Sequence, residues 1–288
     1  MNGLIGIDWG STNLRVFHLG TDGEILDVRT FPFGITKLAN TDFGPTLKTV
    51  VAELPSNLPI IMCGMIGSAH GWHEVDYLPC PCSIGDLSNN LVDISGLANR
   101  ECYLIRGVSG LSEGGFVDVM RGEETQIFGV PPTVQICLPG THCKWVSFAN
   151  GEIISFSTHL TGELFGLLST SGLLSKCIQP SPFDSDSFEE GCQLALQGGN
   201  LLHQLFSVRS RFVSGSLTSV QTGSYLSGVL IGSELSTQSL SSVVTVVGTS
   251  SLAQKYALGL SMLGVESTCY SGETACANGL FAIWKERK

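Results

Sequence analysis

The chain has 288 residues, of which 43% are hydrophobic, 35 are glycine and only 14% are charged, so it is long enough for two turn-rich globular domains. Its formal net charge of −10 argues against general binding of nucleic-acid backbones, which favours dense lysine and arginine. With 15 lysines and arginines in all, any bound phosphate must be held largely by backbone amides and a metal ion.

The start of the chain lacks the features of a targeting segment. Asp8 interrupts the first hydrophobic run, and no segment approaches 18 uninterrupted apolar residues, so neither a secretory signal nor a membrane span is expected. The ten cysteines are scattered without a CxxC pair, which is typical of reduced thiols that serve as small core residues. We therefore expect a cytoplasmic protein.

The first part of the chain predicts a strand hairpin followed by alternating strands and helices. Strands are expected at 3–8, 14–19, 24–31, 59–62 and 101–106, with a helix at 43–54. This order is typical of a ribonuclease-H-like lobe.

The pattern restarts after about residue 116. We expect strands at 134–138, 145–148, 152–157 and 243–247, and helices at 161–176, 188–206, 223–231, 251–263 and 273–288. The repetition predicts an α/β protein of two ribonuclease-H-like lobes, the actin-like ATPase fold, with the active site in the interlobe cleft. The predicted lobes are residues 1–115 and 116–288.

Two glycine-bearing turns, each between two apolar runs, are the most informative feature of the sequence. The first contains Gly10, Ser11, Thr12 and Asn13, and the second contains Gly140, Thr141 and His142. Glycine and hydroxyl residues at such a turn let backbone N–H groups approach a phosphate chain without an intervening Cβ. Two such turns, one in each half, predict that the lobes close on a nucleoside triphosphate.

Three residues near these turns are further candidates for nucleotide binding. Asp8 ends the first strand, where a carboxylate can hold Mg²⁺ beside the triphosphate. Lys144 could reach a phosphate or could be an exposed strand lysine. Gly248 follows the last buried strand, on the side expected for adenosine, although a plain turn with Ser250 as helix N-cap is the alternative.

Longer sequence blocks resemble the 2-dehydro-3-deoxygalactonokinase family, within the actin/hexokinase/Hsp70 class of nucleotide-dependent enzymes. The blocks that carry the resemblance are IGIDWGSTNLRVF (5–17), GMIGSAHGWHEVDYLPCP (64–81), DVMRGEETQIFG (118–129), LPGTHCKWV (138–146), FSTHLTGELF (156–165), LFSVRSRF (205–212) and SYLSGVLIGSEL (224–235). The resemblance implies an ATP- and Mg²⁺-dependent kinase that phosphorylates 2-dehydro-3-deoxy-D-galactonate at the 6-hydroxyl, in galactonate catabolism.

Phosphoryl transfer to an alcohol requires a base that orients and deprotonates the hydroxyl. Related sugar kinases place a carboxylate after a glycine, some fifteen residues before the second phosphate turn. Glu123 and Glu124 lie 17 and 16 residues before Gly140. Glu123, directly after Gly122, is the favoured base, and Glu124 is the alternative. An exposed pair of glutamates at the start of a helix would explain the same residues.

The block after the buried strand 59–62 predicts substrate recognition. Gly67, Ser68 and Trp72 offer a turn, a hydroxyl and an aromatic wall for a polyhydroxy acid, although Trp72 could equally pack in the core. The substrate carboxylate requires a cation, and Arg15 and Arg121 are the candidates.

Other functions remain open from the sequence. His70, His73, Glu74, Asp76, Cys80 and Cys82 are a dense set of metal-ligand types, but HxxH followed by CxC does not match a standard zinc spacing. The alternatives are a kinase for another 2-keto-3-deoxy sugar acid, a non-catalytic sugar-acid regulator and a chaperone-like ATPase of the same superfamily. The expected partners are the sugar acid and ATP, and a homodimer is left open.

Overall fold

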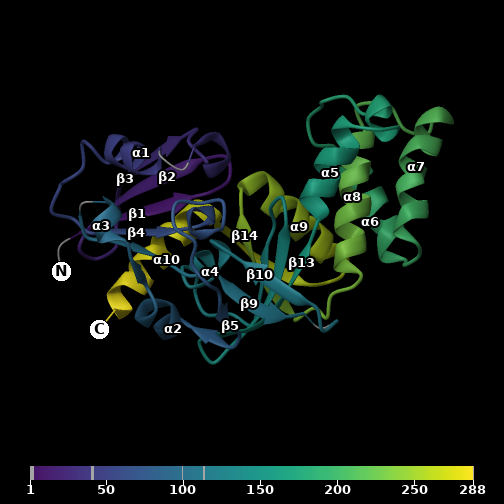
Figure 1. The fold of residues 1–288 in the computed structure, drawn as a ribbon. Coiled ribbons are helices and arrows are strands. Elements are labelled where there is room, and N and C mark those ends of the chain that lie inside the picture. Colours follow the sequence, from purple (N-terminus) through teal and green to yellow (C-terminus); the bar gives the residue numbers. More distant parts are fainter. Residues whose placement is uncertain (1–2, 40–41, 99, 113, 288) are drawn as a thin grey trace. The chain divides into compact units, whose positions relative to one another are not determined.

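The computed structural model describes residues 3–39, 42–98, 100–112 and 114–287 (Figure 1). The chain divides into two compact units: unit 1 is residues 1–133, 146–157 and 270–288, and unit 2 is residues 134–145 and 158–269. The sequence predicted one boundary, between residues 115 and 116. The units are discontinuous because α10 (Gly272–Glu286), late in the chain, packs on strands formed near its beginning.

Unit 1 is built on a six-stranded sheet with the order β3-β2-β1-β4-β8-β7. Its strands are β1 (Leu4–Trp9), β2 (Leu14–Leu19), β3 (Ile25–Phe31), β4 (Ile60–Cys63), β7 (Val92–Asp93) and β8 (Cys102–Leu104). A three-stranded sheet has the order β10-β9-β5, from β5 (Leu78–Pro79), β9 (Val108–Leu111) and β10 (Val117–Met120), and β6 (Cys82–Ser83) pairs with β13 (Glu152–His159). The helices are α1 (Phe43–Val50), α2 (Ile84–Asn89), α3 (Ser95–Ala98), α4 (Glu123–Ile127) and α10, with 3-10 turns η1 (Ile35–Lys37) and η2 (Met65–Gly67).

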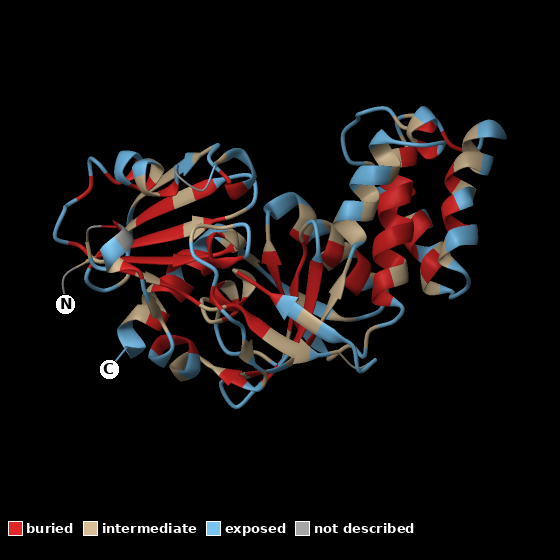
Figure 2. Ribbon diagram, viewed as in Figure 1, coloured by how far each residue is buried: buried red, intermediate tan, exposed pale blue. Residues whose placement is uncertain are grey.

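The core of unit 1 follows from the apolar runs of its central strands. In β1 every residue except Asp8 is buried, because the strand has neighbours on both sides and covered faces (Figure 2). Trp9 is fully buried: its ring meets Phe43 edge-on at 5.6 Å, and its indole N–H donates to the Phe33 carbonyl at 2.7 Å. Asp8 is therefore the polar exception at the end of an apolar strand.

Two glycines allow α4 and α10 to pack backbone against backbone. A Cβ on Gly279 of α10 would lie 1.8 Å from the Thr125 carbonyl oxygen, and one on Gly129 would lie 1.7 Å from the Ala275 carbonyl oxygen. On β1, a Cβ on Gly6 would meet Leu280 at 2.8 Å. This helix is thus held against both α4 and β1.

Unit 2 combines a small sheet with five helices. Parallel pairing joins β11 (Gln135–Leu138) to β14 (Val243–Gly248), with Ile136 opposite Thr245, and the sheet extends to β12 (Cys143–Ala149) and β15 (Glu266–Ser271). The helices are α5 (Thr161–Thr170), α6 (Ser185–Leu196), α7 (Leu201–Val213), α8 (Thr222–Leu235) and α9 (Ser250–Met262), and a 3-10 turn, η3 (Leu174–Cys177), follows α5. Helix α8 is buried almost all round, which explains its lack of a polar face.

Most predicted strands and helices are found, but several differ from the structure. The helix expected at 161–176 ends at Thr170, before Gly172 with its positive φ, and η3 follows it. The short strands β5, β6, β7, β9 and β10 were not predicted. The single helix expected at 188–206 is wrong: Gly198 and Gly199, both with positive φ, end α6, and the Asn200 side chain caps α7. The strand β15 was missed because its sequence, ESTCYS, is largely polar and exposed, and so carries no alternation.

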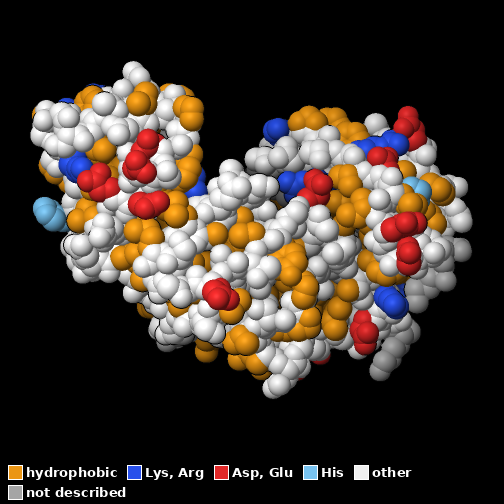
Figure 3. All heavy atoms as spheres, turned by 180° about the vertical axis from the view of Figure 1, so that it is seen from behind, with side chains coloured by type: hydrophobic (Ala, Val, Ile, Leu, Met, Phe, Trp, Pro, Cys, Tyr) orange, Lys and Arg blue, Asp and Glu red, His pale blue; other side chains and the backbone are white. Residues whose placement is uncertain are grey.

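Surface properties agree with the composition. Within the described ranges, no helix combines the length and hydrophobicity needed to cross a bilayer. On the face drawn in Figure 3, Lys and Arg side chains occur singly or in small groups beside acidic ones.

The contact of α10 with α4 gives a test of the fold of unit 1. We expect Gly279→Ala to lower the free energy of unfolding by about 3 kcal/mol, because the added methyl overlaps a backbone carbonyl that cannot rotate away. The measurement is the urea midpoint.

Gly166→Ala is the matched control, since Gly166 lies inside α5 with nothing within 4 Å of the added Cβ. It should gain up to ~1 kcal/mol from helix propensity alone. Equal midpoints for Gly279→Ala and the parent protein would contradict the packing described.

Candidate active site

The turn after β1 is anchored to residues 34–36 through its carbonyl groups, and within the turn the Gly10 N–H donates to the Asn13 carbonyl at 2.9 Å. The carbonyl oxygens of Gly10, Ser11 and Thr12 accept hydrogen bonds from the backbone N–H groups of residues 34–36, at 3.0–3.1 Å. In a planar trans peptide the N–H points opposite to the carbonyl of the preceding residue. The N–H groups of Ser11, Thr12 and Asn13 therefore point away from residues 34–36, as a row of donors suited to an anion.

Gly34 is required for this arrangement. A Cβ on Gly34 would lie 2.2 Å from the Ser11 carbonyl oxygen, so any larger residue would push the turn out of position. The Thr36 hydroxyl adds a 2.7 Å bond to the same oxygen. The turn is thus a fixed cradle rather than a loose loop.

Asp8 lies beside this turn, with a side chain that is 18% exposed. Its Oδ2 accepts a 2.9 Å hydrogen bond from Arg15 Nη1, and Arg15 also lies 3.9 Å from Glu273. Burial raises the pKa of Asp8, and the charge of Arg15 opposes that rise. Arg15 is therefore committed to acidic side chains of unit 1, and Asp8 supplies a hard oxygen ligand at the edge of the cradle.

Two glycines bring the predicted catalytic carboxylates close to Asp8. Gly64 has φ +93°, and a Cβ there would lie 3.2 Å from Asp8 Oδ1. Gly122, with φ +113°, is the N-cap of α4, and a Cβ there would lie 3.3 Å from the Cα of Gly64. The start of α4, with Glu123 and Glu124, is therefore next to the end of β4 and the Asp8 carboxylate.

The two glutamates differ in their surroundings. Glu123 is half-buried, and its Oε2 accepts a hydrogen bond from the Arg121 backbone N–H at 3.1 Å. Glu124 is fully buried, with Oε2 bonded to the Gly122 N–H at 2.7 Å and Oε1 to the Thr125 hydroxyl at 3.2 Å. Burial, assisted by the charge of Glu123, raises the pKa of Glu124 to about 7. Of the two glutamates, only Glu123 has a carboxylate that solvent can reach.

Arg121 is a buried cation with incomplete hydrogen bonding. Its side chain stacks over Tyr77 at 4.2 Å, and Nη2 donates to the Val75 carbonyl at 2.7 Å. Within the described chain, Nε and Nη1 are buried without a hydrogen-bond partner. Gly67 makes room for this guanidinium, since a Cβ there would lie 2.9 Å from Nη1.

Ser68 and Trp72, the other predicted substrate residues, take part in local packing. The Ser68 hydroxyl donates to the Met65 carbonyl at 2.7 Å and is 9% exposed. Trp72 stacks on Phe43 at 6.5 Å and packs against the core of unit 1. These contacts fit the packing alternative for Trp72.

The second turn, in unit 2, is also anchored through carbonyl groups. The Thr141 carbonyl accepts from the Glu163 backbone N–H at 2.8 Å, and a Cβ on Gly162 would lie 2.1 Å from the Gly140 carbonyl oxygen. His142 Nε2 lies 2.6 Å from Glu163 Oε2 on the exposed side of the turn. By the same planar-peptide argument, the N–H groups of Thr141 and His142 point away from α5.

A cavity of about 340 Å³ opens beside this turn. Its walls are apolar and aromatic residues with scattered hydroxyls and one lysine: Gly140, Thr141, Thr161, Gly162, Phe165, Ser227, Leu230, Ile231, Thr249, Ser251, Leu252, Lys255 and Tyr256. Burial lowers the pKa of Lys255, whose Nζ lies 5.2 Å from the ring centre of Phe183. This size and lining suit a nucleoside with phosphates leading toward Gly140.

Gly248 and Lys144 lie at the edge of this region. A Cβ on Gly248 would lie 3.3 Å from the Pro139 carbonyl oxygen, so Gly248 packs closely against the residue that precedes Gly140 of the second turn. Thr249, rather than Ser250, is the N-cap residue of α9. Lys144 is 5% exposed and donates to the Thr158 hydroxyl at 2.8 Å, which differs from an exposed strand lysine.

Glu234 organises the cavity wall and was missed by the sequence analysis. This buried carboxylate accepts hydrogen bonds from Trp145 at 2.6 Å, from Tyr256 at 2.9 Å and from Thr161. It therefore ties together β12, α5, α8 and α9. The sequence did carry a signal for it: Glu234 is a lone glutamate in the apolar run of α8. A charged residue in a buried helix requires hydrogen-bond partners.

The zinc alternative for residues 70–82 finds no support in the geometry. His70, His73, Glu74 and Asp76 are exposed, and the described residues of this block do not converge on one point. The described groups that do converge are Asp8 with Cys63 and Cys276, and Cys137 with Cys143 and Glu234.

Comparisons with known proteins identify relatives that match nearly the whole chain. A family model described as 2-keto-3-deoxy-galactonokinase matches residues 8–283. A 2-dehydro-3-deoxygalactonokinase of Escherichia coli is 33% identical over 97% of this chain and 96% of its own length. A crystal structure named for a 2-dehydro-3-deoxygalactonokinase protein of Sinorhizobium meliloti superposes with a TM-score of 0.90, at 29% identity and 97% coverage of both chains.

A more distant likeness concerns the fold alone. The Acidaminococcus fermentans (R)-2-hydroxyglutaryl-CoA dehydratase component A has a TM-score of 0.56 at 14% identity, with full coverage of both chains. The predicted α/β, actin-like ATPase fold is confirmed.

The raised pKa of Glu124 makes stability depend on pH. The folded carboxyl keeps its proton up to about pH 7, whereas its ordinary pKa is 4.5, so its stabilising contribution is complete below about pH 4.5 and is lost as the pH rises through about 7. Glu124→Gln cannot titrate at this position. We therefore expect the variant to lose the part of the pH dependence of the unfolding free energy that Glu124 causes, on the order of 3 kcal/mol at most, as measured by urea unfolding at a series of pH values.

Gly166→Ala serves again as the control, because it changes no titratable group. It should shift the unfolding free energy at every pH while retaining the parental slope against pH. A Glu124→Gln profile parallel to that of the parent would show that this carboxyl does not carry the effect.

Proposed function

The chain belongs to the 2-keto-3-deoxy-galactonokinase family and is a kinase with an alcohol acceptor, and from this premise we propose its substrate and chemistry. It transfers the γ-phosphoryl group of ATP to the 6-hydroxyl of 2-dehydro-3-deoxy-D-galactonate, giving the 6-phosphate, in galactonate catabolism. The observation that carries the proposal is the turn of residues 10–13: the carbonyls of Gly10, Ser11 and Thr12 are bonded to residues 34–36, which directs the N–H groups of residues 11–13 away from that segment.

The proposal assigns nucleotide-binding roles to elements of each unit taken by itself. The cavity of unit 2 takes adenosine, and Thr141 and His142 offer N–H groups to a phosphate. The turn of residues 10–13 in unit 1 holds another phosphate. Asp8 fits Mg²⁺, directly or through water, because it is a partly exposed carboxylate beside that turn. The metal would neutralise charge on the phosphates during transfer.

Glu123 is the base that we assign to the 6-hydroxyl. As the hydroxyl oxygen attacks the γ-phosphorus and ADP departs, the Glu123 carboxylate orients that hydroxyl and accepts its proton. A substrate hydroxyl can reach Glu123 more easily than Glu124, because both oxygens of Glu124 are buried and already hydrogen-bonded. Glu124 acts as a positioning residue: it holds the Gly122 N–H and so the start of α4.

Arg121 is assigned to the substrate carboxylate. Its buried Nε and Nη1 lack acceptors, and a bound carboxylate would supply them with charge-assisted hydrogen bonds. Arg15 is less suitable because Asp8 already occupies it.

The proposal predicts ADP release that needs both Mg²⁺ and the galactonate-derived keto acid. A panel of 2-keto-3-deoxy sugar acids, each with and without Mg²⁺, should give the highest kcat/KM for that acid. Glu123→Gln should lower kcat by about 10²- to 10⁴-fold with little change in KM, because the base acts on the transition state.

Glu124→Gln separates the two glutamates, since Gln resembles the protonated acid. A larger kcat loss in Glu124→Gln than in Glu123→Gln would reverse the assignment of the base. Ligand binding without ADP release would favour the regulator alternative.

Removing the charge of Arg121 should weaken binding of the acid in particular. We expect Arg121→Met to raise KM by about 10- to 100-fold, the cost of a lost charge-assisted hydrogen bond, and Arg121→Lys to raise it less. The measurement is KM for the keto acid and for its methyl ester. If the variant lost equal affinity for acid and ester, Arg121 would act through packing with Tyr77 rather than on the carboxylate.

A further inference from the structure

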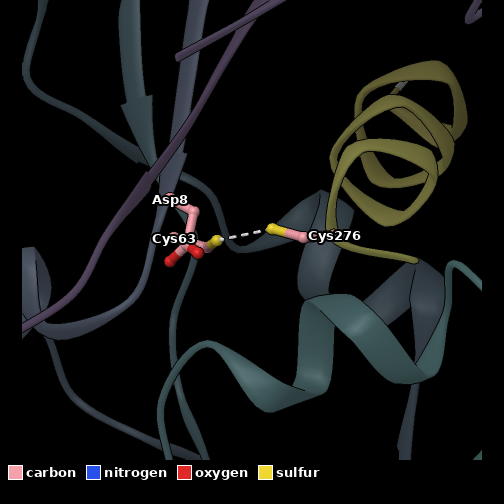
Figure 4. A group of neighbouring side chains, drawn as sticks. All are labelled: Asp8, Cys63 and Cys276. Atoms are coloured by element: carbon pink, nitrogen blue, oxygen red, sulfur yellow. Dashed lines mark hydrogen bonds between the residues drawn. The ribbon is translucent and has the colours of Figure 1, made fainter. Parts of the chain in front are cut away.

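Two thiols and a carboxylate converge at the end of β1 (Figure 4). One ligand atom each from Asp8, Cys63 and Cys276 lies within 4.8 Å of the others. The two sulfur atoms are 3.7 Å apart, and both thiols are buried, whereas the Asp8 side chain remains 18% exposed.

Rigid elements hold these three groups. Asp8 and Cys63 are opposite each other in the parallel register of β1 and β4. Cys276 lies in α10, one turn before Gly279, where the helix rests on the Thr125 carbonyl. The cluster is thus set by backbone pairing and helix packing, not by loop conformation.

The spacing fits a tetrahedral thiolate site. With metal–sulfur bonds of about 2.3 Å, two thiolates on one tetrahedral zinc ion lie about 3.8 Å apart. The observed 3.7 Å between Cys63 and Cys276 requires almost no movement. We propose that Asp8, Cys63 and Cys276 form a binding site for a thiophilic divalent cation of the Zn²⁺ class, with water as the fourth ligand on the exposed side of Asp8.

A disulfide is the competing fate of the two thiols, and it requires both movement of the sulfurs and an oxidant that accepts two electrons. An S–S bond is about 2.05 Å long, so the sulfurs would have to approach by more than 1.5 Å while β4 and α10 are held by their own packing. Metal binding needs no such approach. It needs only the release of the two thiol protons to solvent as the sulfurs bind.

Charge also balances at this site. Two thiolates and one carboxylate carry three negative charges, which a divalent cation and the neighbouring Arg15 guanidinium offset. Mg²⁺ prefers oxygen ligands and gains nothing from sulfur, whereas Zn²⁺ and Cd²⁺ favour it. On the proposed function, the thiophilic ion would compete with Mg²⁺ for Asp8 and inhibit the kinase.

A similar cluster in unit 2 lacks a carboxylate that is free to bind a metal. Cys137 and Cys143 have sulfurs 3.6 Å apart near Glu234, but both oxygens of that buried carboxylate accept hydrogen bonds from Trp145, Tyr256 and Thr161. The exposed carboxylate edge that Asp8 offers is missing from this second described group. It serves as the internal control.

The test is a titration of the whole reduced protein with Cd²⁺, in a Cys269→Ser background that removes the exposed thiol. The readout is the ultraviolet charge-transfer absorption of cadmium thiolate. We expect one equivalent to bind, and binding at least about tenfold weaker in Cys63→Ala and in Cys276→Ala, since loss of an outer partner alone costs about 10- to 100-fold. Cys137→Ala should bind as the background protein does.

Two results would overturn the proposal: no thiolate absorption in the background protein, or the same absorption in a Cys63→Ala, Cys276→Ala double variant. If either alanine variant fails to fold by circular dichroism, serine at that position keeps the side-chain volume while removing the sulfur. A separate experiment measures how strongly Zn²⁺ inhibits ADP release by the background protein and by the variants. Cd²⁺ binding is read without turnover, so a failure of the proposed function leaves this test intact.

Discussion

Three backbone carbonyls tied to residues 34–36 determine which way the first turn presents its N–H groups. Because a peptide plane is rigid, fixing the oxygens of Gly10, Ser11 and Thr12 also fixes the following N–H groups. Gly34 permits the close approach that makes this possible. The anion-binding character of the turn therefore depends on a segment some twenty residues away as much as on the turn itself.

The surroundings of Asp8 also depend on glycines that allow close backbone packing. Gly64 and Gly122, both in backbone conformations that favour glycine, bring β4 and α4 to the carboxylate without intervening Cβ atoms. Glu123 and Glu124 then face different environments although they are adjacent, because one helical step separates a buried position from a half-exposed one. Position in the helix, rather than residue type, separates the two carboxylates.

Much of the fold could be predicted from the sequence, because apolar runs and glycine turns are local signals. The strands of the first hairpin and the helices α8, α9 and α10 follow from such runs. Asn200 and its two preceding glycines were visible, yet the apolar residues on either side suggested one helix. In the candidate site, the turns and the glutamate pair stand out as sequence patterns, but which glutamate is buried depends on how α10 covers α4. Glu234 was missed, and the burial of Lys144 was not predicted, because their surroundings come from distant segments.

Unit 1 takes its strands from the beginning of the chain and its covering helix from near residue 280. During synthesis, β1, β2 and β4 leave the ribosome long before α10 exists, so the face that Leu280 and Cys276 cover stays open while all of unit 2 is made. Unit 2, apart from one short early segment, is continuous and can close first. The surroundings of Asp8 are therefore complete only once α10, the last helix of the chain, has been made and packs on β1 and β4.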